Sequence, residues 1–162
     1  MKQIQQRDGH VVGMKFLSWI TAASLLLLGQ VARADNMMMA RTTQTFPEAM
    51  AELQNQIRSK GYVVSRVQRV DIGLTKSGYK TDKYRVVFYG KPDEIRQLSQ
   101  THPELTAYLP LKISIFAEDR DTILVTANPK HLNKAGDAAL AKIVNRWEQD
   151  LVDIFRQMRE SN

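Results

Sequence analysis

Few side chains in this 162-residue sequence occur in patterns that carry chemistry. Cysteine is absent, which excludes disulfides, thiolate nucleophiles and cysteine-ligated zinc. No G-x-S-x-G elbow marks a serine as a nucleophile. Glu118, Asp119 and Asp121 cluster in a short turn, where they either bind a hard cation or, as we expect, face solvent. The motifs therefore predict no catalytic residue, no metal site and no cofactor.

Histidine is the remaining candidate for acid–base chemistry, because its pKa lies near neutrality. Beyond residue 34, His102 lies in a Thr-His-Pro segment, and His131 follows Pro129-Lys130 near the start of a predicted helix. We expect both to be solvated loop side chains. The alternative is an enzyme, such as a hydrolase, that uses one of them as general base. Exposed, widely separated histidines without carboxylate neighbours would exclude that alternative.

The first 34 residues have the pattern of a secretory signal peptide. Lys15 precedes an apolar run over 16–29, and the small-x-small step Ala32-Arg33-Ala34 follows it. The run is shorter than the roughly 20 residues that a membrane span needs. We predict a cleaved periplasmic protein with one domain over 35–162; the alternative is an uncleaved anchor. Met14, directly before Lys15, would open a compact signal and is favoured as the true start.

The formal charge of +6 is unevenly distributed along the chain. Residues 1–34 carry four cations and one carboxylate, so only +3 remains for residues 35–162. That excess is too small to predict a nucleic-acid partner.

Beyond residue 36 the sequence alternates between strand and helix patterns. Thr45 and Glu48 form a capping box before an apolar helical stripe that ends at Gly61. A short helix is predicted after Pro92, and a long packing helix over 140–158, where apolar residues recur every three or four positions.

The strand patterns cover 37–45 (alternatively a flexible terminus), 62–70, 83–89, 111–117 and 123–127, and a loop or loose hairpin is predicted over 71–82. Hairpin-linked strands with helices to one side predict an α+β domain with a largely antiparallel sheet.

Several short steps in the sequence resemble the domain of unknown function 302 family. They are Gly61-Tyr62, Phe88-Tyr89-Gly90-Lys91-Pro92, Pro103, Leu109-Pro110-Leu111 and Asn128-Pro129. The resemblance covers about 46–155. It implies a small α+β domain in which a curved antiparallel sheet packs against helices, similar to TATA-binding-protein-like folds. The family has no established activity, so the resemblance implies no catalytic residue.

The lack of catalytic motifs and the export pattern together favour a non-catalytic binding or accessory protein. A long helix that crosses a curved sheet can leave an apolar cleft for a small ligand or a partner protein. Tyr62, Tyr84, Phe88 and Trp147 are the candidate wall residues of that cleft, unless they belong to the core.

Alternation on two strands predicts a second surface. If Tyr84, Val86, Phe88, Leu111, Ile113 and Ile115 face the helices, the opposite face carries Arg85, Val87, Tyr89, Lys112, Ser114 and Phe116. A solvated sheet face is usually more polar than this mixture. The pattern therefore predicts either a homodimer interface that includes Arg85, Tyr89, Lys112 and Phe116, or a face that the 71–82 loop covers.

Export has a measurable consequence at the N-terminus. Mass spectrometry of the periplasmic protein should show Asp35 as the first residue, and a chain that starts at Met14 should be exported as well as the full one. Recovery of the intact apolar segment in the membrane fraction would contradict the prediction of a cleaved periplasmic protein.

Overall fold

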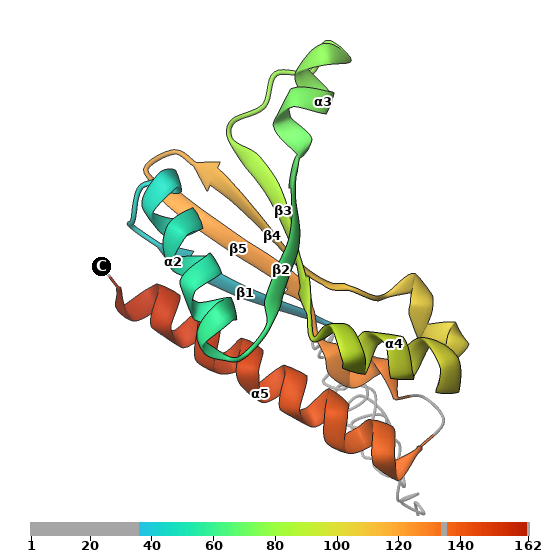
Figure 1. Ribbon diagram of the computed structural model, residues 1–162. Coiled ribbons are helices and arrows are strands. Elements are labelled where there is room, and N and C mark those ends of the chain that lie inside the picture. The colour runs from blue at the N-terminus through green and yellow to red at the C-terminus, as the bar shows by residue number, and fades with distance from the viewer. Residues whose placement is uncertain (1–35, 134–135, 162) are drawn as a thin grey trace, which may run out of the picture. The chain divides into compact units, whose positions relative to one another are not determined.

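The computed structural model describes residues 36–133 and 136–161, which form a five-stranded antiparallel sheet with helices on one face (Figure 1). The strand order is β1-β5-β4-β3-β2. The strands are β1 (Met37–Thr42), β2 (Val63–Arg69), β3 (Tyr84–Gly90), β4 (Leu111–Glu118) and β5 (Asp121–Ala127). The helices are α2 (Phe46–Ser59), α3 (Val70–Lys76), α4 (Pro92–Thr101) and α5 (Ala138–Glu160), with the 3-10 helices η2 (Pro103–Ala107) and η3 (Pro129–Leu132).

The predicted α+β class, with a largely antiparallel curved sheet and a long C-terminal helix, is confirmed. Residues 35–162 form one compact unit, and the core cluster lies entirely within it. This part of the chain therefore has a hydrophobic core of its own. The predicted signal peptide over 1–34, including Met14, lies outside the described residues.

The long helix α5 packs an apolar stripe against the sheet, as predicted. Its buried residues are Leu140, Val144, Trp147, Leu151, Ile154, Phe155 and Met158. Fully burying a large apolar side chain contributes roughly 1.5–3 kcal/mol, so this stripe is a principal source of stability. No helix among the described residues, α5 included, is long and apolar enough to cross a membrane.

Helix α2 covers the same face of the sheet beside α5 (Figure 1). The predicted capping box forms at its start: the Glu48 carboxylate accepts hydrogen bonds from the Thr45 N–H at 3.0 Å and from the Thr45 hydroxyl at 2.7 Å. Gly61 follows the helix with a φ of +76°, the left-handed conformation that glycine adopts without strain. Sequence reasoning therefore placed both ends of α2 correctly.

Strand β3 is turned opposite to the prediction for its two faces. Val87 and Tyr89 are 0% and 1% exposed, lie on the helix side and pair with Ile113 and Leu111 of β4. The prediction is right for β4 and wrong for β3, whose residues Tyr84, Val86 and Phe88 pair with Phe116, Ser114 and Lys112 on the other face. Both alternating sets in this strand are largely apolar, so alternation alone did not decide which set faces the core.

Strands β2 and β3 continue beyond the body of the domain and carry α3 at their far end (Figure 1). No residue from 66 to 86 is buried, and we call this segment the arm. Its α3 replaces part of the predicted 71–82 loop. The helix is held by an ion pair between Asp71 and Arg85, and Gly78 follows it with a φ of +85°. Because α3 buries no side chain, the sequence shows no apolar stripe there.

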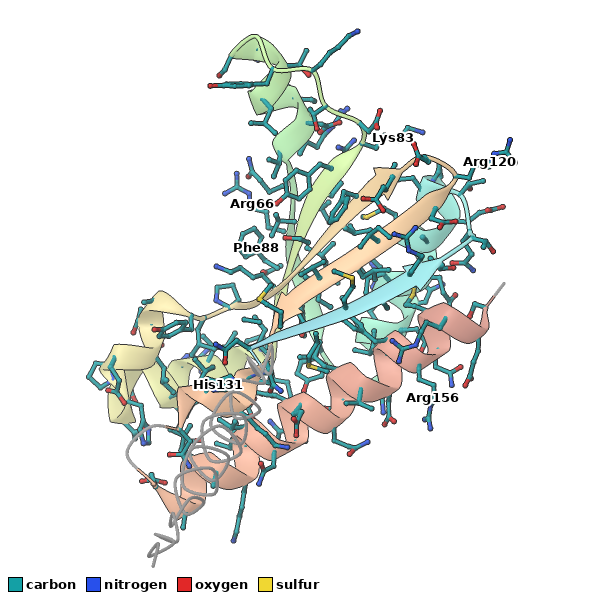
Figure 2. All side chains as sticks on the ribbon, turned by 180° about the vertical axis from the view of Figure 1, so that it is seen from behind. Arg66, Lys83, Phe88, Arg120, His131 and Arg156 are labelled. Carbon is teal, nitrogen blue, oxygen red and sulfur yellow. The ribbon has the colours of Figure 1, made fainter. Side chains whose placement is uncertain are left out.

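The sheet face opposite α2 and α5 has no helix over it among the described residues (Figures 1 and 2). Met37 and Met39 are exposed, and Phe88 and Phe116 are half-buried. The arm extends away from this face. Its return segment 81–83 borders Phe116 across an open hollow of about 390 Å³, and the ring of Tyr84, the next residue, contacts the Phe116 ring edge to face. The alternative in which the 71–82 segment covers the face is therefore not observed.

Homodimerisation through this open face remains a prediction, with Phe116 and Lys112 on the face and Arg85 and Tyr89 on its other side. If two copies pair there, Phe116→Asp should yield monomers without unfolding the domain, because a two-fold interface repeats the added charge. Light scattering of residues 35–162 at micromolar concentration measures the mass, with Tyr79→Asp on the arm as control. A monomer mass for the wild type would contradict the prediction.

Candidate functional site

Both histidines of the described chain line one pocket at the α4 end of the sheet. The pocket has a volume of about 250 Å³, and we call it the histidine pocket. It is lined by His102, Glu104, Leu105, Tyr108, His131, Leu132 and Leu140. Three leucines supply an apolar floor, and two imidazoles, a carboxylate and a phenol supply the polar groups. Such a combination is typical of sites for small organic ligands.

The topology of the sheet explains why two histidines 29 positions apart meet. Strands β3 and β5 are both antiparallel to β4, so their C-terminal ends lie at the same edge of the sheet. α4 and η2 follow β3, and η3 follows β5. Pro103 and Pro129 are the first residues of η2 and η3, since the first turn of a helix tolerates a missing N–H.

His102 lies next to a carboxylate at the start of α5. Its Nε2 is 3.7 Å from Asp137 Oδ2, and its Nδ1 is 2.9 Å from the Thr101 hydroxyl oxygen. The 3.7 Å separation is longer than a hydrogen bond. The two contacts involve the two different ring nitrogens, so they restrain the orientation of the imidazole from two sides.

Asp137 has a second task as the N-cap of α5. Its carboxylate accepts a hydrogen bond from the Leu140 N–H at 2.7 Å. This backbone hydrogen bond is the main cause of a lowered pKa for Asp137, and His102 lowers that pKa further. The carboxylate therefore stays ionised beside the imidazole.

His131 lies in η3, and Figure 2 labels it at this end of the molecule. The Asn128 side chain begins η3 by accepting from the Lys130 N–H at 3.0 Å. Lys130 Nζ lies 2.6 Å from the Glu148 carboxylate of α5, which also accepts from the Asn128 side chain at 3.2 Å. These contacts tie the segment that carries His131 to the same helix that Asp137 begins.

A smaller pocket of about 70 Å³ shares Tyr108 and Leu132 with the histidine pocket. Its lining also includes Tyr89 of β3, Lys112 of β4 and Leu151 of α5. Tyr108, which is 50% exposed, therefore stands between the two volumes. A ligand with an apolar body can occupy one volume while its polar group reaches the histidines in the other.

The four predicted wall residues do not form one cleft, because the structure divides them between the two faces of the sheet. Tyr62 and Trp147 lie on the helix side and are buried. The Tyr62 hydroxyl donates to Asp150 at 2.7 Å, and Trp147 Nε1 donates to Glu94 at 2.9 Å. Burial, followed by the Asp150 hydrogen bond, raises the pKa of Tyr62. Both residues therefore act as hydrogen-bonded core side chains.

Tyr84 and Phe88, the other two predicted wall residues, lie on the open face. Their strand partners there are Phe116 and Lys112, and the Tyr84 and Phe116 rings meet edge to face, with 6.0 Å between the ring centres.

The acidic turn that the sequence offered as a possible cation site binds an arginine side chain. Arg41 forms ion pairs with Glu118 and Asp121, each at 2.6 Å.

Sequence reasoning predicted solvated histidines, and His131 is exposed while His102 is half-buried. It did not predict that they line one pocket, and it missed Glu104, Tyr108 and Asp137. The sequence did contain one signal for this pocket, because Pro103 and Pro129 mark a tight turn beside each histidine. It contained no signal that the two turns lie close together. Among residues 36–133 and 136–161, no group of three or more histidine, cysteine or acidic side chains is placed to hold a metal ion.

The comparisons with known proteins concern the fold. The family model for the domain of unknown function DUF302 matches residues 38–158. The crystal structure of an uncharacterized conserved DUF302 protein from Bacillus stearothermophilus is similar, with a TM-score of 0.68 and 18% identity, over 76% of this chain and 98% of that chain. At this identity the likeness establishes the fold alone. No curated protein matches the chain.

Asp137→Ala should lower the thermal midpoint of residues 35–162 at neutral pH, because the N-cap acceptor of α5 is lost. The lowered pKa of Asp137 means that its contribution is present above the ordinary aspartate value of 3.8 and is lost as pH falls through the depressed value. The difference between wild type and variant, measured by circular dichroism, should therefore shrink between pH 7 and pH 3. Glu160→Ala is the control, and a difference that does not depend on pH would contradict this role.

Proposed function

The chain belongs to the family of domain of unknown function DUF302, and on that premise we propose that it is an exported, non-catalytic protein that binds a small ligand in the histidine pocket. The family description names no activity, so one observation carries the proposal. Two histidines from separate turns converge over a floor of three leucines. Export is supported by the signal-peptide pattern of residues 1–34.

The lining of the pocket indicates the class of ligand. An apolar ring or chain fits against Leu105, Leu132 and Leu140. Imidazole N–H groups of His102 and His131 donate to a carboxylate, sulfonate or phosphate, and a protonated ring adds charge to the hydrogen bond. The volume of about 250 Å³ limits the ligand to a small molecule, since drug-sized ligands occupy roughly 300–1,000 Å³. The ligand is therefore a small amphiphile with an anionic or strongly polar group.

A second candidate is a periplasmic enzyme with His102 as general base. The observation in its favour is the carboxylate of Asp137 at 3.7 Å, because a base held by a carboxylate is the arrangement that hydrolases use. The described lining residues of the histidine pocket include no serine, threonine or cysteine. The nucleophile would then be a water molecule. Binding without catalysis needs no such additional group and is the function we prefer.

The fluorescent probe 8-anilinonaphthalene-1-sulfonate tests the binding function, because it joins apolar rings to a sulfonate. Wild-type residues 35–162 should enhance its fluorescence, and the double variant His102→Ala, His131→Ala should bind on the order of a hundredfold more weakly, since each of the two lost hydrogen bonds to a charged group contributes at least roughly 1.5 kcal/mol. Tyr79→Ala on the arm is the matched control and should bind like wild type.

Thermal unfolding must show that the double variant is folded, because partly folded proteins also bind this probe. Equal affinity of a folded double variant, or no binding by wild type, would exclude the histidine pocket as the site. Turnover of a p-nitrophenyl ester that His102→Gln abolishes would replace the binding proposal with the hydrolase.

A further inference from the structure

The positive charge of the described chain is concentrated in the arm. Residues 66–86 contain two carboxylates, Asp71 and Asp82, and a net charge of +4. The six cations are Arg66, Arg69, Lys76, Lys80, Lys83 and Arg85. The rest of the described chain has twelve cations and thirteen carboxylates. The sequence total of +3 beyond residue 34 concealed this separation, because the average hides a charged projection on a nearly neutral body.

Ion pairing within the arm leaves its excess charge facing outward. Arg85, at the base, binds Asp71 and lies 5.6 Å from the centre of the Phe46 ring. The Arg85 hydrogen bond is the main cause of a lowered pKa for Asp71. That pair is electrically neutral, so five cations remain with Asp82 as the one other carboxylate of the arm. Figure 2 labels two of the five, Arg66 and Lys83, at different levels along the arm; Lys83 is exposed, with its Nζ 6.0 Å from the centre of the Phe46 ring.

The arm also exposes apolar side chains close to its lysines. Ile72 on α3 and Tyr79 just beyond it are exposed, Tyr79 by 65%. Val67 is exposed further along the ribbon. A surface projection that combines lysines with a tyrosine and an aliphatic residue is suited to the headgroup region of a membrane, where tyrosine places its ring between the apolar and aqueous layers.

We propose that the arm docks reversibly on an anionic lipid surface. Lys76, Lys80 and Lys83 approach the headgroup phosphates, and Ile72 and Tyr79 enter the interfacial layer. The neutral body stands back from the surface, so its carboxylates do not oppose the approach. This is a peripheral attachment and needs no membrane-spanning helix. It also does not depend on the function of the histidine pocket, which lies at the other end of β3.

A nucleic acid also attracts cations, but it fits the arm less well. Recognition of single strands relies on several aromatic side chains that stack on bases, and duplex recognition relies on an element that fits a groove. Near its tip the arm exposes one aromatic side chain, Tyr79, and one aliphatic side chain, Ile72. An exposed aliphatic side chain cannot stack on a base, but it can insert into the interfacial layer of a membrane.

Cosedimentation with vesicles tests the proposal on residues 35–162. The wild type should bind vesicles of phosphatidylcholine with phosphatidylglycerol and should not bind phosphatidylcholine alone, and added salt should weaken the binding. The triple variant Lys76→Gln, Lys80→Gln, Lys83→Gln should bind on the order of a hundredfold more weakly, because each basic residue near an anionic surface contributes about fivefold.

A second triple variant, Arg58→Gln, Arg120→Gln, Lys142→Gln, removes the same charge from outside the arm and should bind like wild type. Because all six substituted side chains are exposed, both variants should keep the wild-type thermal midpoint. Tyr79→Ser should weaken vesicle binding without changing its salt dependence. Equal binding by the two triple variants, equal binding to neutral vesicles, or tighter binding of duplex DNA than of anionic vesicles at the same salt would overturn the proposal.

Discussion

The packing of α5 against one face of the sheet is the constraint on which the other features depend. Its seven buried residues, with Trp147 the largest, meet Val87, Ile113 and Leu124 from three neighbouring strands in one core cluster. Close packing in such a core leaves little room for movement. α2 and α5 both cover that face, whereas α3 lies at the far end of β2 and β3 and α4 lies at the opposite end of the sheet (Figure 1). None of the described helices therefore covers the other face, and the far parts of β2 and β3 extend without cover. The open face and the arm are thus consequences of one-sided packing.

Polar groups at the flanks of α5 decide where its neighbours attach. Asp150 accepts from the Tyr62 hydroxyl, and Asp153 accepts from Lys60 at 2.7 Å, which fixes the turn between α2 and β2. On the α4 side, the Glu94 carboxylate binds Arg146 and the Trp147 indole. Leaving a buried donor without a partner costs roughly 1–3 kcal/mol, so these contacts restrict the geometry as well as stabilise it. They hold α4, and with it the segment that leads to His102, against the body of the domain.

The two candidate functional regions lie at opposite ends of the β2–β3 ribbon. One is a small concave pocket with imidazoles at the start of α5, and the other is an exposed basic projection. Such a separation allows a protein to sit at a surface by one end while the other end stays open to solvent. The fold provides both from short local features: two proline-initiated turns in one case, and a strand pair that extends past the helices in the other.

The sequence by itself determined the elements whose signals are local. The Thr45–Glu48 box and Gly61 define α2, the repeat of apolar residues defines α5, and hairpin spacing defines the antiparallel strands. It did not determine which side of β3 faces the core, because the set with the charged Arg85 is the less apolar one and yet the pairing with β4 places its Val87 and Tyr89 in the core. It also did not show that His102 and His131 share a pocket, or that the net charge gathers on the arm. Proximity across 29 residues and the projection of a strand pair are properties of the folded chain, since they arise from strand order and from which faces the helices cover.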